Sequence, residues 1–230
     1  MPRSGSSRQG WLVASYAGAA VFFALEAVAR APGEASDLAA AESDQGTTRQ
    51  IVAAYGLAAG LSPVLRRLRA GRLPPVSGPA GVGIMAAGLA LRAWSMRTLG
   101  AYYSRTLRTT ADQNVVEDGP YRVIRHPGYL GSIMVWTGFA VTSGSAAAAA
   151  GVAALMGNAY SRRIASEEAM LTGRFGSAYV GYSQRTVQNR WHMPASRAMI
   201  WGRRSRARPQ PSCRVLQLIA SNRRTRAPLV

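Results

Sequence analysis

Long apolar runs, separated by polar or basic connectors, constrain the fold of this chain more than any other feature of its sequence. The first run covers residues 11–31 and follows a short basic start. A helix of about twenty apolar residues crosses a bilayer core of roughly 30 Å. A signal peptide shares the basic start, but this run is long and contains Glu26, which favours a membrane helix.

Four more apolar runs favour four further helices. They cover residues 51–65, 80–94, 129–142 and 146–160. The link Ser143-Gly144-Ser145 between the last two is so short that these helices must run antiparallel, as a hairpin. We therefore predict an all-α, multi-pass integral membrane helical bundle of about five transmembrane helices, or of four if the second is peripheral.

Proline and glycine positions predict local details of these helices. Pro63 lies near the end of the second run and lacks a backbone donor, so we expect the helix to end or kink there. Gly81, Gly83 and Gly88 lie in the third run, where small residues allow close approach of a neighbouring helix.

Charge is distributed unevenly along the chain. All 28 basic residues are arginine, and the net charge is +18. Ten of them follow Val187, where there is no acidic residue, while the preceding part has 18 basic and 10 acidic residues, a net charge of +8. We accordingly divide the chain into N-terminal helices and connectors (1–79), a core (80–186) and a basic tail (187–230).

The tail is arginine-rich and lacks periodicity, so we expect it to be disordered. It either binds anionic lipid or nucleic acid through charge alone or has no selected function, and we expect no specific nucleic-acid partner. The single Cys213 excludes a disulfide framework, and two histidines without paired cysteines argue against a structural zinc site.

Basic connectors give conflicting signals about membrane topology. The positive-inside rule compares the arginine-rich connector at 66–72 with the acidic loop at 32–49 and places the connector in the cytoplasm. The segment 97–125 is also basic, yet only one crossing separates it from that connector. We give priority to the segment 97–125, because it borders the residues that are expected to carry the chemistry. This choice predicts an active site facing the cytoplasm from a cell or inner membrane.

A polar stretch at 119–131, with the sequence GPYRVIRHPGYLG, lies at the start of the fourth apolar run. Pro120 and Pro127 each lack an N–H and disfavour helix in the residue before them, so we expect a shaped connector. The connector carries His126, one of only two histidines. A fixed polar segment beside a hydrophobic helix is costly, which makes it the first place to expect chemistry.

A second polar block follows the fifth apolar run. Arg163 and Glu167 are four residues apart and therefore share a face of a helix. Two interpretations are open here: a solvated surface ion pair, worth under about 1 kcal/mol, or a functional pair near the bilayer surface. Farther along, Tyr179 and Tyr182 are expected to pack or to anchor at the interface, whereas Glu117 is expected to be a solvated loop charge.

Together these blocks resemble the isoprenylcysteine carboxyl methyltransferase family, within the broader group of membrane phospholipid methyltransferases. The resemblance covers about residues 89–185. It rests on GPYRxxRHPxYxG followed some forty residues later by RIxxEExxLxxxFGxxYxxY. Members of this family are multi-pass enzymes that bind S-adenosylmethionine in a pocket built by their last two helices and the flanking connectors. The resemblance therefore implies an S-adenosylmethionine-dependent methyltransferase with its cofactor pocket at the cytoplasmic side.

Carried over residue by residue, the resemblance implies a set of site residues. Glu167 would close the cofactor pocket opposite the connector, and Arg163 would face the methyl acceptor as the substrate-binding residue. These two are the candidate catalytic residues, and no metal is expected. The other cofactor contacts would be Gln113, Asn114, Val115, Val116, Tyr121, His126, Pro127, Gly128 and Tyr129.

The residue types suit these roles. The sulfonium of the cofactor is a cation, for which tyrosine faces and a carboxylate are suitable neighbours. Arg163 offers a planar fork that matches a carboxylate in bidentate fashion. A carboxylate acceptor is already ionised at neutral pH, so its methylation needs no general base and depends on positioning and desolvation. An amine or a hydroxyl would need a base, for which Glu168 and His126 are the candidates.

The favoured reaction is carboxyl O-methylation of a lipophilic, isoprenylcysteine-like acceptor from the bilayer. Two alternatives stay open: N-methylation of a phospholipid head group or small amine, and a non-catalytic membrane scaffold of the same fold. Two departures from the family pattern matter. Gln113 replaces the usual histidine, which keeps hydrogen bonding but not protonation, and Ser143-Gly144-Ser145 replaces Asn-Pro or Asn-Trp. The acceptor and the oligomeric state cannot be read from the sequence.

Overall fold

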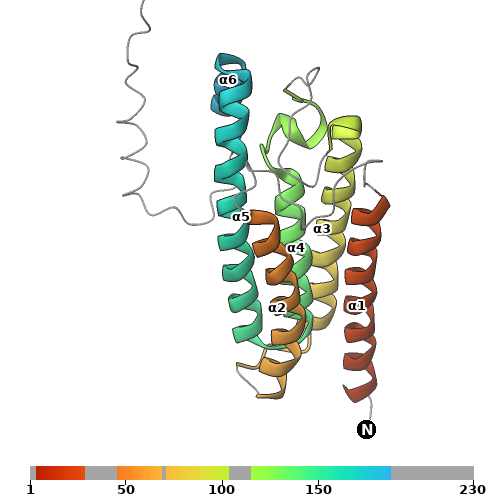
Figure 1. Cartoon of the computed structure of the whole chain (residues 1–230). Coiled ribbons are helices and arrows are strands. Elements are labelled where there is room, and N and C mark those ends of the chain that lie inside the picture. Colours follow the sequence, from red (N-terminus) through yellow and green to blue (C-terminus); the bar gives the residue numbers. More distant parts are fainter. Residues whose placement is uncertain (1–3, 29–45, 69–70, 104–114, 188–230) are drawn as a thin grey trace, which may run out of the picture. The chain divides into compact units, whose positions relative to one another are not determined.

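The described residues form helices, with no strand beyond isolated bridges. The computed structural model of the chain describes residues 4–28, 46–68, 71–103 and 115–187, all within the unit formed by residues 1–192. The long helices are α1 (Ser4–Val28), α2 (Thr47–Arg67), α3 (Ser77–Leu99), α4 (Pro127–Thr142) and α5 (Ala146–Phe175) (Figure 1). The short elements are the 3₁₀ turns η2 (Gly100–Tyr102) and η3 (Gly119–Arg122) and the helix α6 (Ser177–Arg185). The all-α prediction is confirmed for these residues.

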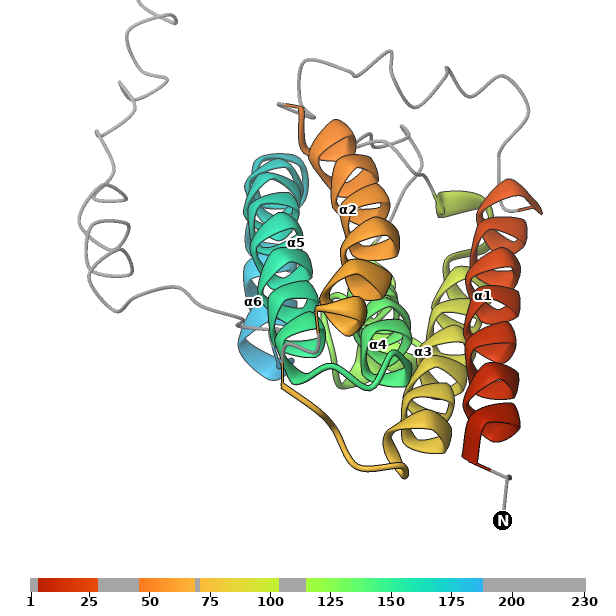
Figure 2. The same cartoon turned by 90° about the horizontal axis from the view of Figure 1, so that it is seen from below.

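Helix α4 lies at the centre of the bundle. It packs against α1, α2, α3 and α5, and the view from below shows it between α5 and α3 (Figure 2). Its Trp136 is almost fully buried and stacks on Tyr55 of α2, with 4.9 Å between ring centroids. Phe22 of α1 meets both rings edge-on, at 5.4 and 5.9 Å. Aromatic pairs of this geometry stabilise the core beyond their buried area and tie three helices together.

Glycines bring α3 and α4 into close contact. A Cβ on Gly88 would lie 2.6 Å from the carbonyl oxygen of Gly131, and a Cβ on Gly81 would lie equally close to that of Gly138. A Cβ on Gly83, which is exposed, would meet nothing within 4 Å. The predicted close approach is confirmed for Gly81 and Gly88 and is wrong for Gly83. Residues 81 and 88 are seven apart and share a face, whereas residue 83 lies on the opposite side.

Proline does not end α2 where the sequence suggested. Pro63 lies inside the helix, which continues to Arg67. Of the two expectations for Pro63, an end or a kink, the end is therefore wrong, and the kink stays a prediction. Ala54 and Ala58 of α2 are buried in the core, and the helix packs on α5. This packing outweighs the loss of a single backbone hydrogen bond in the last turns of the helix.

The predicted hairpin is confirmed. Helix α4 ends at Thr142, α5 begins at Ala146, and the two pack against each other. The Ser145 hydroxyl oxygen accepts from the backbone N–H of Ala148 at 3.2 Å and so caps α5. α5 then continues to Phe175, well past the apolar run, which places the polar block on the same rigid helix.

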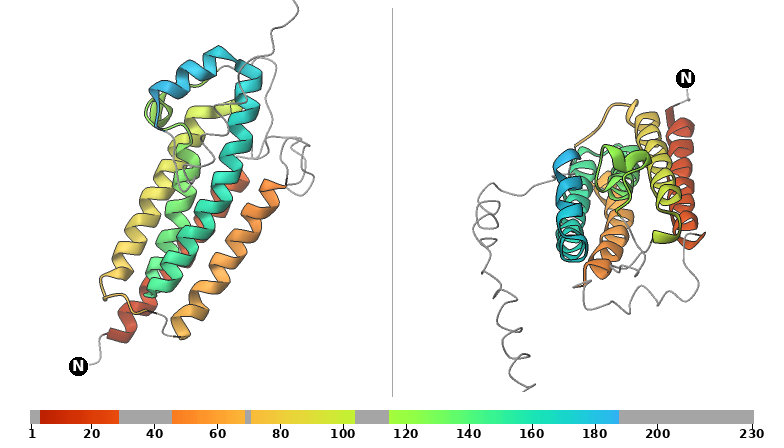
Figure 3. Two further views of the ribbon diagram at one scale, coloured as in Figure 1. Left: turned by 90° about the vertical axis from the view of Figure 1, so that its left-hand side faces the viewer. Right: turned by 90° about the horizontal axis from the view of Figure 1, so that it is seen from above.

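Helix α6 folds back at the end of α5. Gly176 joins the two helices with φ of 53°, a left-handed backbone conformation that glycine adopts without a steric penalty. α6 then runs across the end of the bundle beside η3 (Figure 3). The Tyr182 hydroxyl donates to the Tyr121 carbonyl at 2.9 Å, and the N–H of Arg125 donates to the Val187 carbonyl at 3.1 Å.

One stretch of the described residues, Gln9–Val28 in α1, is long and apolar enough to cross a membrane by length and composition. The count of about five membrane helices and the topology therefore stay predictions. The acidic loop lies largely, and the basic tail almost entirely, outside the described residues.

Candidate active site

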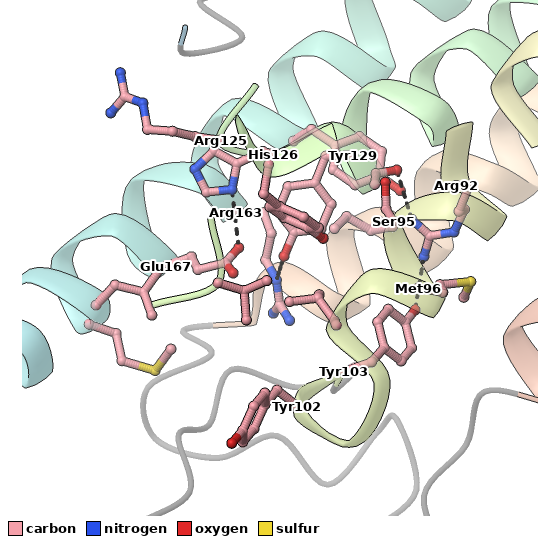
Figure 4. A pocket seen from close by; sticks show the side chains of 18 of the residues that line it. Arg92, Ser95, Met96, Tyr102, Tyr103, Arg125, His126, Tyr129, Arg163 and Glu167 are labelled. Carbon is pink, nitrogen blue, oxygen red and sulfur yellow. Dashed lines mark hydrogen bonds and ion pairs between the residues drawn. The ribbon is translucent and has the colours of Figure 1, made fainter. Parts of the chain in front are cut away.

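A cavity of about 190 Å³ lies where the connector before α4 meets the distal half of α5. Eight of the eleven predicted site residues line it: Val115, Val116, Tyr121, His126, Gly128, Tyr129, Arg163 and Glu167. Figure 4 shows Arg163 and Glu167 reaching toward His126, at the end of the connector, and Tyr129, in the first turn of α4. Two sequence blocks some forty residues apart thus form one site.

One predicted residue that the structure describes, Pro127, does not line this cavity. Pro127 is fully buried at the first position of α4, where its fixed φ suits the start of a helix. It therefore shapes the connector instead of facing the cavity. Gln113 and Asn114 lie outside the described residues, so their role stays a prediction.

His126 is held between two carboxylates. It is 5% exposed, and its Nε2 lies 3.1 Å from Oε1 of Glu168, while its Nδ1 lies 3.6 Å from Oε2 of Glu167. Its ring is nearly parallel to that of Tyr129, with 5.6 Å between centroids. The imidazole is therefore fixed by contacts on its edge and on its face.

The two consecutive glutamates have different surroundings. Glu168 accepts from Arg125 at 2.9 Å and contacts His126, so it joins α5 to the connector. Glu167 lines the cavity, and its buried Oε2 has no hydrogen-bond partner among the described residues. A buried acceptor without a hydrogen bond is costly, which marks Glu167 as a group suited to a ligand.

Arg163 is buried and held by hydroxyl groups. Its exposed fraction is 3%, and its Nε donates to the Tyr129 hydroxyl at 3.2 Å. One terminal nitrogen donates to the hydroxyls of Thr47 and Thr48 at 3.0 and 3.2 Å. The structure thus excludes the interpretation of Arg163 as part of a solvated surface ion pair. The threonines begin α2, and no sequence signal points to them.

Two further charged residues line the cavity, and the sequence motifs did not identify them. Glu26 comes from the last turn of α1 and Arg92 from α3, and the Arg92 Nε donates to the Glu26 Oε1 at 2.5 Å. Both lie within or beside apolar runs. A charged residue in an apolar run needs a partner and is commonly functional. The occurrence of Glu26 and Arg92 in such runs was therefore the sequence signal that could have identified them.

Tyrosines make up much of the cavity wall. Tyr179 and Tyr182 are buried and line it, so the prediction that they pack is confirmed. Burial raises the pKa of Tyr121 well above its usual range, and the nearby Glu167 carboxylate raises it further. Burial also raises the pKa of Tyr182 to about 12. These hydroxyls stay protonated at neutral pH, so they act as hydrogen-bond donors and not as bases.

A loop charge behaves as the sequence predicted. Glu117 is exposed and accepts from the exposed Arg185 at 2.9 Å. A solvated pair of this kind contributes little to stability.

Comparisons with known proteins identify the same region. Residues 81–173 match the model of the isoprenylcysteine carboxyl methyltransferase (ICMT) family. The protein-S-isoprenylcysteine O-methyltransferase of Schizosaccharomyces pombe is 28% identical over 106 residues, which are 45% of this chain and 45% of that protein. The structure of a eukaryotic intramembrane Ras methyltransferase, ICMT, matches with a TM-score of 0.53 and 22% identity, over 61% of this chain and 52% of that one.

These matches span about half the length of each relative. The region 81–173 contains most of α3, the connector, α4 and nearly all of α5, and therefore most of the cavity lining. Glu26, Thr47 and Thr48 lie outside it. The resemblance drawn from the sequence motifs is confirmed: over residues 81–173 this chain carries the sequence pattern of the isoprenylcysteine carboxyl methyltransferase family, and its helices share the fold of a solved member.

Proposed function

We propose that this chain is an S-adenosylmethionine-dependent membrane methyltransferase that methylates the carboxylate of a lipophilic, isoprenylcysteine-like acceptor. One observation carries the proposal. A buried guanidinium, Arg163, and a carboxylate oxygen without a hydrogen-bond partner among the described residues, on Glu167, line the same cavity. The Arg163 guanidinium suits a carboxylate, and the Glu167 carboxylate suits a cation.

The cavity lining fits the proposed cofactor. The Oε2 of Glu167 is a buried acceptor that can take a hydrogen bond from the ribose hydroxyls or the amino group. Tyrosine rings line the same cavity and favour a positive charge. S-adenosylmethionine, when bound, supplies an electrophilic methyl group on a sulfonium. The residues that would hold it are Val115, Val116, Tyr121, His126, Gly128, Tyr129 and Glu167, with Gln113 and Asn114 as further predictions.

Arg163 would orient the acceptor. Its guanidinium is fixed by Tyr129, Thr47 and Thr48, so it can bind a carboxylate without losing much rotamer freedom. Because that carboxylate is ionised at neutral pH, the chain needs no group to remove a proton. The side chains of the cavity would exclude water from the site, and Arg163 would position the acceptor carboxylate for methyl transfer.

The outer faces of α1 and α2 suit a lipid environment. Exposed large apolar side chains on these helices are Val13, Val21, Phe23, Leu57, Leu61 and Val64. In water such a surface would be unfavourable, whereas in a bilayer it is the expected one. We propose an integral, multi-pass membrane protein that takes its acceptor from the bilayer and binds its cofactor at the cytoplasmic side.

A methyl-transfer assay tests the reaction class. Purified protein in detergent receives S-adenosylmethionine with a labelled methyl group and either an S-prenylated N-acylcysteine or phosphatidylethanolamine vesicles. We expect label in the prenylcysteine product that is released by mild base, because methyl esters hydrolyse and methylamines do not. Base-stable label in the phospholipid would instead establish N-methylation. Cofactor binding without transfer to either acceptor or to a total membrane extract would support the scaffold alternative.

Cofactor binding tests the role of Glu167. We expect Glu167→Ala to raise the cofactor Kd by about 10- to 100-fold, because a hydrogen bond to a charged group contributes about 1.5–3 kcal/mol. Glu117→Ala is the matched control, since Glu117 is exposed and lies outside the cavity lining. Equal affinity in the two variants would remove Glu167 from the cofactor site.

A further inference from the structure

A closed ring of polar contacts lies at the α1 side of the cavity. The Arg92 Nε donates to Glu26 Oε1 at 2.5 Å, and another nitrogen of the same guanidinium donates to the Tyr103 hydroxyl at 3.2 Å. That hydroxyl in turn donates to Glu26 Oε2 at 3.3 Å. Glu26 and Arg92 are 9% and 6% exposed. The three side chains, from α1, α3 and the residue after η2, therefore hold one another in fixed positions.

The third guanidinium nitrogen reaches the connector. Nη1 of Arg92 donates to the carbonyl oxygen of Gly128 at 2.8 Å. Gly128 lies between His126 and Tyr129, the two side chains that face Arg163 and Glu167 across the cavity. All three nitrogens of Arg92 thus donate to groups of the protein. The arginine is committed to holding structure and is not presented to a ligand.

Burial keeps this arrangement in one protonation state. Burial raises the pKa of Tyr103 well above its usual range, so its hydroxyl remains a donor to the carboxylate. A buried ion pair is costly to break, because the group left behind keeps an uncompensated charge. Removing either charged partner should consequently disrupt the whole set of contacts among Glu26, Arg92 and Tyr103.

We propose that Glu26 is a positioning residue of the site: through Arg92 it fixes the Gly128 end of the connector, and thereby the wall of the cavity formed by His126 and Tyr129. This role lies in α1, outside the region 81–173 that the family model matches. Its effect on cofactor affinity rests on the proposed function, while its effect on the connector does not.

A lysine variant separates positioning from simple charge pairing. Arg92→Lys keeps a positive charge beside Glu26, but an ammonium cannot donate in a plane to Glu26, Tyr103 and Gly128 at once. If the pair only neutralises charge, the lysine variant behaves as wild type. If it positions the connector, Arg92→Lys and Glu26→Gln share the same defect. The matched control is Glu117→Gln, which alters an exposed glutamate–arginine pair.

Hydrogen exchange of the protein without added cofactor provides the first measurement. We expect Glu26→Gln and Arg92→Lys to raise exchange about tenfold for the amides of residues 130–132, the first hydrogen-bonded amides of α4, with no change at residues 152–157 in the middle of α5. Equal protection of residues 130–132 in wild type and Arg92→Lys would overturn the proposal. Should Glu26→Gln fail to fold, Arg92→Lys and Tyr103→Phe supply the same comparison.

Cofactor and acceptor constants provide the second measurement. We expect both variants to raise the KM for S-adenosylmethionine about tenfold, because the displaced His126 and Tyr129 are proposed cofactor contacts. The acceptor KM should rise less, because only the hydrogen bond from Arg163 to the Tyr129 hydroxyl links this wall to the proposed acceptor residue. A wild-type protein that binds no cofactor would refute the proposed function, and the exchange result would still decide the positioning role. Wild-type cofactor constants in Arg92→Lys would overturn that role alone.

Discussion

Replacing Arg163 by lysine should lower kcat/KM for methyl transfer by about a hundredfold or more, a loss of at least about 2.7 kcal/mol of transition-state stabilisation. Lysine keeps the charge but not the planar fork, which donates to the hydroxyls of Tyr129, Thr47 and Thr48 and which we propose binds the acceptor carboxylate. The shorter and more strongly hydrated ammonium would also be placed where the guanidinium is 3% exposed. Initial rates with a prenylcysteine acceptor check this result.

The control for Arg163→Lys is the same substitution at the neighbouring arginine, Arg162. Arg162→Lys makes the same change one residue earlier on α5, at an exposed position, and should leave the rate within about twofold. Cofactor affinity should change little in Arg163→Lys, because Arg163 is assigned to the acceptor. A cofactor Kd that rises as much as the acceptor KM would contradict that assignment and place Arg163 on the cofactor.

The second large effect concerns folding. Gly88→Ala should destabilise the protein by about 3 kcal/mol, because the new methyl group would lie 2.6 Å from the carbonyl oxygen of Gly131 and 2.8 Å from the backbone nitrogen of Val135. Both contacts are with backbone atoms of α4, which cannot rotate away. The helices must separate, and the packing around the buried Trp136 is lost with them. Unfolding of the detergent-solubilised protein, followed by circular dichroism, measures the change.

Gly83→Ala is the matched substitution on the same helix. A methyl group there meets nothing within 4 Å, so the change should stabilise the helix by up to about 1 kcal/mol through its higher helix propensity. The two variants therefore shift stability in opposite directions. Destabilisation of similar size in both would mean that α3 is sensitive to any added side chain, and would refute the specific contact between α3 and α4.

Local sequence patterns predicted the long helices and the central residues of the candidate site. Apolar runs placed α1 to α5, and the two polar blocks brought His126, Tyr129, Arg163 and Glu167 together because each block has its own spacing. The glycine prediction was only partly right, because small residues were counted without assigning them to a face. The seven-residue spacing of Gly81 and Gly88 contained that information.

Long-range contacts could not be predicted in the same way. Thr47 meets Arg163 across 116 residues, and Glu26 meets Arg92 across 66. No spacing in the sequence encodes such pairs, since they depend on which helices become neighbours in the bundle. A charged residue within an apolar run does indicate that the fold must supply a partner for it. Glu26 in the first apolar run is such a residue, but nothing in the sequence identified Arg92 as its partner.

The backbone bonds between α6 and the connector have a consequence for biosynthesis. The Val187 N–H donates to the Val123 carbonyl at 2.8 Å, and the Val187 carbonyl accepts from the N–H of Arg125. These bonds join the last described residue to the segment directly before His126. During translation the helical hairpin can form first, as domains form from the N-terminal side. The segment before His126 can make these bonds only after residue 187 has left the ribosome, so we expect this wall of the cavity to take its final shape only once α6 has been synthesised.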